Sequence, residues 1–267
     1  MVYDTLGSQP ASWAGRTYSE IVETAAHDGS VLVVPVGSVE QHGSHMPVGT
    51  DTILVDAVAH HSVERVEEDI PVLVTPSVWS GYSPHHMSFG GTITLEYDDM
   101  LDTVEGIADS TLENGFDALL LLNGHGGNGS LVSSATSTIG MEHPEAEVLG
   151  LTYFQLAGSF IDEVRDTDLG GMGHAGEFET SLMLYLRPEL VEEDLAEGTN
   201  MDEPYPQSIQ DLTAGGPLSV YRDFSEYTES GAIGDPMVAS AEKGKRVLEL
   251  LCDEMEDILT RMHERNR

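Results

Sequence analysis

Residues 118–129 read ALLLLNGHGGNG, a run of apolar residues that ends in a turn containing four glycines. A short, uninterrupted apolar run bounded by a glycine turn is typical of a strand that is covered on both faces of a sheet. We expect Ala118–Leu122 to be the central strand of the fold, because it is the most apolar run in the chain. The polar turn that follows it is then the first place to look for a functional site.

Shorter apolar runs on either side of this stretch predict its neighbouring strands. They are Val31–Val36, Val72–Pro76 and Val148–Tyr153, and a short β-like segment is expected at Thr92–Leu95. Amphipathic periodicity predicts helices at residues 52–67, 97–114, 131–139, 178–186 and 237–261. Strands that alternate with helices predict an α/β fold with a largely parallel sheet. A length of 267 residues suits one domain, residues 1–267, in which the acidic segment 188–235 has no clear period.

The charge of the chain is strongly unbalanced. It has 11 Lys and Arg residues against 47 Asp and Glu residues, a formal net charge of −36. Such a surface repels DNA, RNA and anionic membranes, so we expect no nucleic acid and no membrane as partners. At 1 M salt the Debye length falls to ~3 Å, and the repulsion between carboxylates is then weak. The composition therefore indicates a halophilic protein that works at high internal salt.

The chain contains no segment that resembles a membrane span or a signal peptide. No stretch approaches the ~18 continuous apolar residues of a spanning helix, and residues 1–10 lack a basic flank followed by an apolar run. We therefore expect a cytoplasmic protein. The single cysteine, Cys252, lies in a helical pattern and is expected to be a buried structural thiol.

The first cluster of chemically active residues follows Val31–Val36 and reads GSVEQHGSHMPVGTD, residues 37–51. In an extended segment side chains alternate, so Glu40 and His42 point the same way and can share a metal site. Asp51 returns at the start of the next predicted helix, where its carboxylate could bridge two cations. The alternative for Asp51 is that it simply caps that helix.

The second cluster is the glycine turn itself, residues 123–129. A histidine among four glycines, His125, has no core to pack into, which favours catalysis or metal binding. The same turn also fits the dinucleotide pattern G-x-G-x-x-G through Gly124, Gly126 and Gly129. The acidic residue expected after the next strand is missing, but a nucleotide-binding oxidoreductase stays a competing hypothesis of a different class.

The third cluster reads GHAGEFETS, residues 173–181, and opens a predicted helix. Residues His174 and Glu177 are three apart, so they share one side of that helix. A histidine with two carboxylates, Glu177 and Glu179, suggests a metal ligand together with an acid or base. Glutamates in a first helical turn are also favoured by the helix dipole, which explains them without a function but leaves His174 unexplained.

Taken together, these segments resemble the creatininase (creatinine amidohydrolase) family. The resemblance is carried by PVGSVEQHGSHMPVGTD (residues 35–51), LLLLNGHGGN (119–128), HAGEFETSLML (174–184), SPHHMSFGGTITL (83–95) and DPMVASAEKG (235–244). It implies a three-layer α/β/α fold, a homo-oligomer (hexamer or dimer) and a binuclear metal centre that hydrolyses a non-peptide C–N bond. By this resemblance one ion takes Glu40, Asp51 and His125, and the other takes His42, the bridging Asp51 and a further carboxylate.

The sequence departs from creatininase itself at that further carboxylate. The creatinine hydrolases carry a glutamate two positions after the histidine of the second motif, where this chain has Gly127. We expect Glu177 to supply the missing ligand. Together with the archaeal type of halophilic composition, the resemblance then favours a formamide hydrolase, the 2-amino-5-formylamino-6-ribosylaminopyrimidin-4(3H)-one 5'-monophosphate deformylase of flavin and deazaflavin biosynthesis. Creatininase and mycofactocin-type peptidase activities are the alternatives.

The expected chemistry assigns further residues. His174 would move a proton to the leaving nitrogen, with Glu179 or a backbone group holding its tautomer. Backbone N–H groups of Gly126 and Gly127 would face the developing oxyanion, and Tyr82 and His86 are the candidates for substrate contact. Mixed nitrogen and oxygen ligands suit zinc, manganese or iron(II) as the two divalent ions.

Overall fold

The computed structural model describes residues 7–199, 205 and 207–267. Its centre is a sheet of four parallel strands in the order β2-β1-β3-β4. The strands are β1 (Val31–Val36), β2 (Val72–Val74), β3 (Ala118–Asn123) and β4 (Glu147–Thr152). The expected parallel sheet is confirmed, and Ala118–Leu122 lies in an interior strand as predicted.

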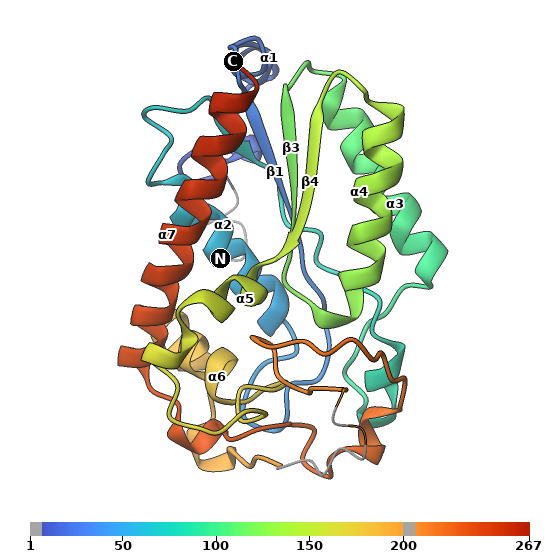
Figure 1. Ribbon diagram of the computed structural model, residues 1–267, viewed down its shortest axis with the longest axis vertical. Helices are drawn as coiled ribbons and strands as arrows, with labels where there is room; N and C mark the ends of the chain where they lie inside the picture. Colours follow the sequence, from blue (N-terminus) through green and yellow to red (C-terminus); the bar gives the residue numbers. More distant parts are fainter. Residues whose placement is uncertain (1–6, 200–204, 206) are drawn as a thin grey trace.

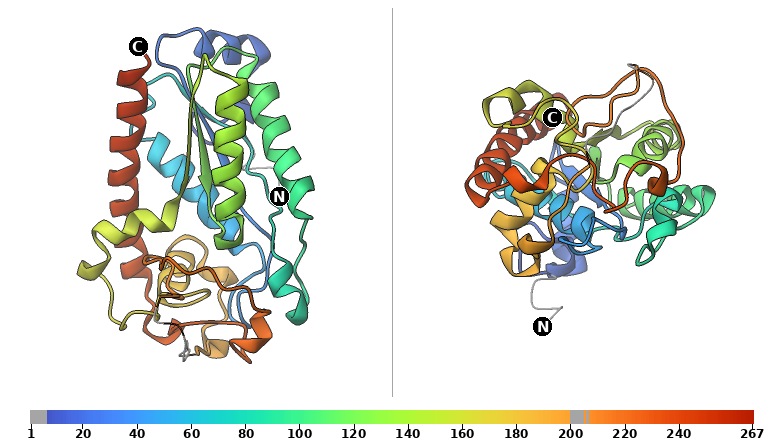
Figure 2. Two further views of the ribbon diagram at one scale, coloured as in Figure 1. Left: turned by 45° about the vertical axis from the view of Figure 1, so that its right-hand side comes forward. Right: turned by 90° about the horizontal axis from the view of Figure 1, so that it is seen from below.

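Helices cover both faces of this sheet. The helices are α1 (Tyr18–Ala25), α2 (Thr50–Val63), α3 (Tyr97–Leu112), α4 (Gly129–Glu142), α5 (Tyr153–Leu156), α6 (Glu177–Leu186) and α7 (Ala241–Arg265). Helices α1, α3 and α4 share one buried apolar cluster with the sheet, and α2, α5, α6 and α7 share another. Figures 1 and 2 show α3 and α4 on one side and α7 on the other. The fold is therefore a three-layer α/β/α arrangement.

The side chains of the central strand explain why both layers form. Ala118, Leu120 and Leu122 belong to the cluster under α2 and α7, whereas Leu119 and Leu121 belong to the cluster under α3 and α4. Successive side chains of a strand point to opposite faces, so an unbroken apolar run must be covered twice. The whole of β3 is buried as a result.

The remaining elements are short and mostly lie beyond the carboxyl ends of the strands. Short 3-10 helices occur at Pro84–Phe89 (η2), Gly126–Asn128 (η3), Phe224–Glu226 (η8) and Pro236–Val238 (η9). The long connections gather around α6, below the sheet in Figure 1. Within the described residues, segment 188–235 contains no helix longer than a 3-10 turn, in agreement with its lack of period. Residues 92–95 form isolated bridges rather than the expected strand.

Two further expectations can be checked at this level. Cys252 is buried in α7 as a free thiol, as predicted. In the part of the chain that the structure describes, no helix combines the length and the apolar character needed to cross a membrane.

Candidate metal centre

Three segments that are distant in the sequence meet beyond the carboxyl ends of β1 and β3. They place together five side chains, which we call the central cluster: Glu40, His42, Asp51, His125 and Glu179. None of these residues is more than 3% exposed. Parallel strands end at the same edge of a sheet, which is why segments that follow different strands converge here.

Asp51 lies at the middle of the central cluster, in the first turn of α2. Its Oδ1 is 3.1 Å from His42 Nε2, and its Oδ2 is 3.1 Å from His125 Nδ1. Oδ2 is buried and has no hydrogen-bond partner in the structure. A buried carboxylate oxygen without a partner is costly. Its position between two other ligand-type groups therefore fits a site that is completed by a cation.

The other two carboxylates complete two groups around Asp51. Glu40 Oε2 lies 3.1 Å from His125 Nδ1, and Glu179 Oε1 lies 3.8 Å from His42 Nε2. One group is thus Glu40, Asp51 and His125, and the other is His42, Asp51 and Glu179. Ligand atoms that share one zinc ion at ~2.0–2.2 Å are separated by about 3 to 3.6 Å. The 3.1 Å contacts lie within this range, and the 3.8 Å contact between His42 and Glu179 lies just beyond it.

Both histidines present the nitrogen that a metal would need. His42 Nδ1 lies 3.1 Å from the Glu40 carbonyl, and His125 Nε2 lies 3.2 Å from the Tyr82 carbonyl. A carbonyl accepts only, so each of these outer nitrogens donates its N–H. In a neutral imidazole the inner nitrogen then carries a lone pair that faces the carboxylates. Metal-binding histidines are usually oriented in this way by a second partner.

The electrostatics of the central cluster lead to the same conclusion. Burial lowers the pKa of His125, but Glu40 and Asp51 outweigh it and raise that pKa to about 10. Burial likewise opposes the charge of His42, yet Asp51 and Glu179 bring its pKa well above the ordinary value. The pKa of Asp51 is lowered, because the two histidines overcome its burial. The buried carboxylates thus favour positive charge at this site, which divalent cations would supply.

The third motif contributes His174 beside the central cluster. His174 Nε2 donates to the Gln41 carbonyl at 2.7 Å, and its Nδ1 lies 3.6 Å from Glu40 Oε1. Burial and the neighbouring His42 hold the pKa of His174 well below its usual value. His174 is therefore a neutral base whose Nδ1 faces the cluster. The group that holds its tautomer is a backbone carbonyl, one of the two possibilities expected.

Glu177 does not lie in the central cluster, and this corrects the expectation that it is a metal ligand. Its Oε1 pairs with Lys243 Nζ and accepts the Asp166 N–H at 2.8 Å. Its Oε2 accepts from Thr167, at 3.1 Å from the backbone nitrogen and 2.6 Å from the hydroxyl. Residues two apart on a helix are rotated by about 200°, so Glu177 and Glu179 face opposite sides. The third-motif carboxylate next to His42 is Glu179.

Two of the four glycines of the second motif are explained by packing against protein. A Cβ at Gly124 would lie 2.6 Å from the Val55 side chain, and one at Gly127 would lie 2.3 Å from His125 Nε2. Gly126 has open space, so its N–H remains a candidate for contact with a ligand. The close approach at Gly124 and Gly127 is thus made by the chain itself, which argues against a dinucleotide pyrophosphate in this turn.

The other two expected contact residues lie next to the cluster with different orientations. His86 is buried, with Nε2 3.4 Å from Glu40 Oε1, and burial together with His174 lowers its pKa. Tyr82 turns its ring toward Tyr97 on α3, with ring centroids 5.4 Å apart, and its carbonyl lies 3.2 Å from His125 Nε2.

Several neighbours of the central cluster were not identified from the sequence. Gln41 Nε2 lies 2.9 Å from His86 Nδ1 and donates to the Gly231 carbonyl at 2.9 Å. Phe224 packs its ring 4.1 Å from that of His86 and 4.8 Å from that of His174. His85 forms a further candidate metal group with Glu40 and His125. Gln41 and His85 were visible as neighbours of predicted residues, whereas no sequence signal pointed to Phe224.

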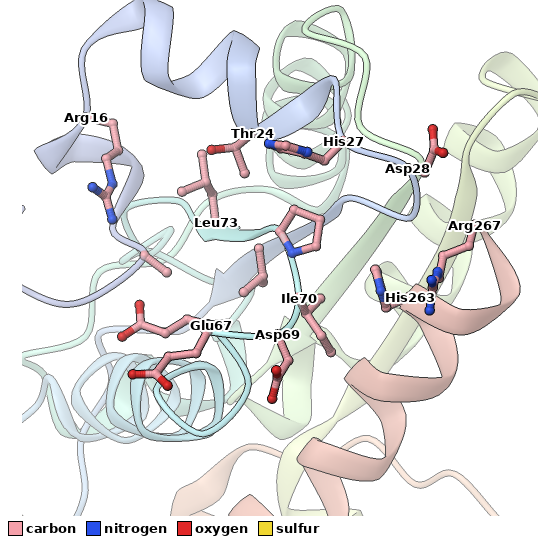
Figure 3. A pocket seen from close by; sticks show the side chains of 14 residues that line it. Arg16, Thr24, His27, Asp28, Glu67, Asp69, Ile70, Leu73, His263 and Arg267 are labelled. Atoms are coloured by element: carbon pink, nitrogen blue, oxygen red, sulfur yellow. The ribbon is translucent and has the colours of Figure 1, made fainter.

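A separate cavity lies at the opposite, amino-terminal edge of the sheet. It has a volume of about 660 Å³ and is lined by residues from α1, the segment between α2 and β2, β2 itself and the end of the chain around α7. Figure 3 shows Arg16 and Glu67 on one side of it and His263 and Arg267 on the other. None of the expected site residues lines this cavity, so it is distinct from the candidate metal centre.

Comparison with known proteins identifies the family and its relatives. The family described as creatininase, creatinine amidohydrolase, matches residues 15–259. A mycofactocin precursor peptide peptidase of Mycobacterium tuberculosis is 32% identical over 235 residues, which cover 84% of this chain and 82% of the relative. A creatinine amidohydrolase of Pseudomonas putida is 31% identical over 261 residues, 91% of this chain and 94% of the relative.

Solved structures of creatininase have the same fold. A manganese form has a TM-score of 0.79 at 28% identity, and covers 93% of this chain and 97% of its own. A Zn–Zn form of a creatininase mutant has a TM-score of 0.80 at 28% identity, with 94% and 98% covered. Together with the family match over most of the length, these similarities show that the chain belongs to the creatininase family.

Proposed function

We propose that this protein hydrolyses a non-peptide C–N bond of a small amide at a centre that holds two divalent cations. The coarser class, a metal-dependent amidohydrolase of the creatininase family, is supported by the family match and by the candidate ligand groups. The observation that carries the proposal is the Asp51 carboxylate. Its two oxygens lie 3.1 Å from two different histidines, and one of them has no hydrogen-bond partner.

The proposed ligands divide into two sets that share Asp51. Glu40 and His125 hold one ion with it, and His42 and Glu179 hold the other. Glu179 thus takes the role that the sequence assigned to Glu177. Manganese and zinc are the favoured ions, because structures of creatininase contain them, and iron(II) also suits mixed nitrogen and oxygen ligands.

The remaining residues act on the substrate and its protons. Divalent ions at this site would supply activation of water at neutral pH and polarisation of the amide carbonyl. His174, neutral and anchored by the Gln41 carbonyl, accepts a proton at Nδ1 and delivers it to the leaving nitrogen. The Gly126 N–H is the proposed oxyanion donor, and His86 together with Phe224 forms the wall that the substrate contacts.

Within this class the specific substrate that we propose is the formylaminopyrimidine ribonucleotide 2-amino-5-formylamino-6-ribosylaminopyrimidin-4(3H)-one 5'-monophosphate, from which formate would be released. The support is indirect. Gly127 departs from creatininase at a ligand position, and the acidic composition is of the archaeal halophilic type. Ring opening of creatinine and cleavage of a mycofactocin-type peptide are the competing activities, since relatives carry those names.

A substrate panel with defined metal content tests the function. The chelated protein is reloaded with Mn²⁺, Zn²⁺ or Fe²⁺ and incubated with the formylaminopyrimidine nucleotide, creatinine and short peptides. We expect metal-dependent release of formate from the nucleotide, abolished by EDTA and restored by metal, whereas conversion of creatinine to creatine or cleavage of a peptide would favour the competing activities. Metal-loaded protein that hydrolyses none of them would overturn the proposal. A melting temperature raised by NAD(P)H but not by metal would favour the oxidoreductase alternative.

We also propose that the protein forms a homo-oligomer. Residues 71–95 contain no Asp, Glu, Lys or Arg, and Trp79, Met87 and Ile93 within them are 56%, 52% and 50% exposed. In so acidic a chain this is a surface on which two copies can meet without opposing carboxylates. Sedimentation at 2 M KCl should show an oligomer that Trp79→Ser weakens. A monomer at every protein concentration would contradict this expectation.

A further inference from the structure

Lys243 is a buried cation outside the central cluster. It lies in the first turn of α7 and is 9% exposed. The chain contains only two lysines. The second lysine, Lys245, is on the same helix with a side chain that is 58% exposed. Burying an ammonium group is costly unless it is paired. The partners of Lys243 therefore indicate what it is for.

Those partners join three separate segments. The Lys243 ammonium contacts Glu177 Oε1, Asp166 Oδ2 at 2.8 Å and the Val238 carbonyl at 2.9 Å. Glu177 is fully buried, and its carboxylate also accepts hydrogen bonds from Asp166 and Thr167. The Lys243–Glu177 pair thus links the start of α7, the start of α6 and the turn at residues 166–167.

The start of α6 is also the segment that carries the metal-centre residues of the third motif. The Glu177 N–H donates to the Gly171 carbonyl at 3.2 Å, which fixes the chain just before the helix. Ala175 adopts a left-handed conformation with φ 55°, and its N–H donates to Glu179 Oε2 at 2.7 Å. Glu179 Oε1 is left facing His42. The position of Glu179 therefore depends on a strained backbone that Glu177 anchors.

Helix α7 packs directly against the same turn of α6. The Ser240 N–H donates to Ser181 Oγ at 3.2 Å, and Ser181 Oγ donates to the Glu177 carbonyl at 2.6 Å. A Cβ at Gly244 would lie 1.9 Å from the Ser181 carbonyl, so the two helices are in backbone contact there. This contact holds Lys243 directly against Glu177.

We propose that Lys243 is a positioning residue, whose ion pair with Glu177 holds the first turn of α6 so that Glu179 can complete the cation site it shares with His42 and Asp51. The inference rests on the proposed metal centre. It also explains why a second buried glutamate stands two residues before Glu179 without touching the cluster. A purely structural pair would stabilise the fold without any preference between the two cation sites.

Titration of the metal-free protein with Mn²⁺, followed by the electron paramagnetic resonance signal of free Mn²⁺, separates the two roles. For Lys243→Met we expect the binding step that Glu179→Gln also weakens to lose about tenfold or more in affinity, as is usual when the support of a metal ligand is removed. The step assigned to Glu40 and His125 should be nearly unchanged. Lys243→Arg, which keeps the charge, should restore part of the loss, and Lys245→Met is the matched control without effect.

The outcomes distinguish a failure of the positioning role of Lys243 from a failure of the proposed metal centre. If wild type binds two ions and folded Lys243→Met binds both with unchanged affinities, the positioning role is overturned while the metal centre stands. If wild type binds no second ion, the proposed centre itself fails. Should Lys243→Met not fold, Thr167→Val removes one hydrogen bond from Glu177 and keeps the ion pair. It should then weaken the same binding step to a smaller extent, and equal weakening of both steps would contradict the proposal.

Discussion

At the scale of single residues, Asp51 shows how far sequence reasoning can reach. Its place at the start of a helix allowed two roles, a cap or a bridging ligand. In the structure the N-cap residue is Gly49, which has no side chain to cap the helix, and Asp51 lies inside the first turn. The helix dipole stabilises the carboxylate there, and both of its oxygens face histidines. The geometry therefore supports the bridging role over the cap.

The choice between Glu177 and Glu179 could not be made from the sequence. Both are buried glutamates in the first turn of α6, and the three-residue spacing from His174 favoured Glu177. What decides it is the backbone before the helix, where Ala175 has a positive φ and turns the chain. A non-glycine residue in that conformation is held by its tertiary surroundings, which no local pattern reveals.

Gly127 provides the prediction at this scale. A Cβ there would lie 2.3 Å from His125 Nε2 and 2.5 Å from the Tyr82 carbonyl. Gly127→Ala should displace the His125 imidazole and lower the affinity for the ion that His125 binds by about 10–100-fold. Gly126→Ala, whose Cβ would meet nothing within 4 Å, is the neighbouring control. Equal Mn²⁺ affinities of the two variants would show that His125 is not a ligand.

At the scale of elements, the strands were predictable and the first helix was missed. Strands β1 and β3 are wholly buried, so their apolar runs are unbroken in the sequence. Helix α1 buries only Ile21 and Ala25, which leaves a weak periodic signal. The signal that could have found it is the capping box formed by Thr17 and Glu20.

Segment 188–235 was expected to be irregular, but its contribution to the site was not predictable. It places Phe224 against the rings of His86 and His174. It also supplies Asp211, which accepts from Arg165 at 2.8 and 3.0 Å and from the Gly170 N–H at 2.8 Å. Contacts of this kind depend on how a loop without periodicity is folded, and such a loop has no pattern from which they can be inferred.

The Arg165–Asp211 pair provides the prediction at this scale. The pKa of Asp211 is lowered, because hydrogen bonds from Arg165 and Gly170 outweigh its burial. Its stabilising effect is therefore present above the ordinary value of 3.8 and is lost as pH falls through the lower folded value. Asp211→Asn, which leaves Arg165 without its carboxylate partner, should reduce the free energy of unfolding at pH 6 by on the order of 3 kcal/mol.

Chemical denaturation at two pH values tests whether the stabilisation by Asp211 is lost at low pH. The difference between wild type and Asp211→Asn should shrink once the pH falls below 3.8, because Asp211 of the unfolded wild type then binds a proton more readily than Asp211 of the folded state. Asp168→Asn, an exposed neighbour in the same loop, is the control. A difference that grows on acidification would mean that the pair does not stabilise the fold.

At the scale of the whole molecule, the prediction of a three-layer α/β/α fold is confirmed. It was predictable because the strand pattern and the family resemblance pointed to the same architecture. The halophilic character stays a prediction. With a net charge of −36, self-repulsion should destabilise the folded state most at low ionic strength, where the Debye length is about 10 Å at 0.1 M.

Thermal unfolding between 0.1 and 2 M KCl tests this statement. The melting temperature should rise steeply with KCl, because the screened carboxylates no longer repel one another. An uncharged osmolyte such as sucrose, at matched osmolality, is the control for general stabilisation and should have a much smaller effect. A melting temperature that is flat across the KCl series would contradict the halophilic interpretation.

The central claim is that Asp51 is shared by two cations, and metal content tests it most directly. Wild type, Asp51→Asn, Glu179→Gln and the exposed-site control Asp102→Asn are loaded with Mn²⁺, desalted and analysed by mass spectrometry of the metal. We predict about two ions per chain for wild type and Asp102→Asn, about one for Glu179→Gln, and almost none for Asp51→Asn, since both ions lose a ligand. Two ions retained by Asp51→Asn would contradict the account.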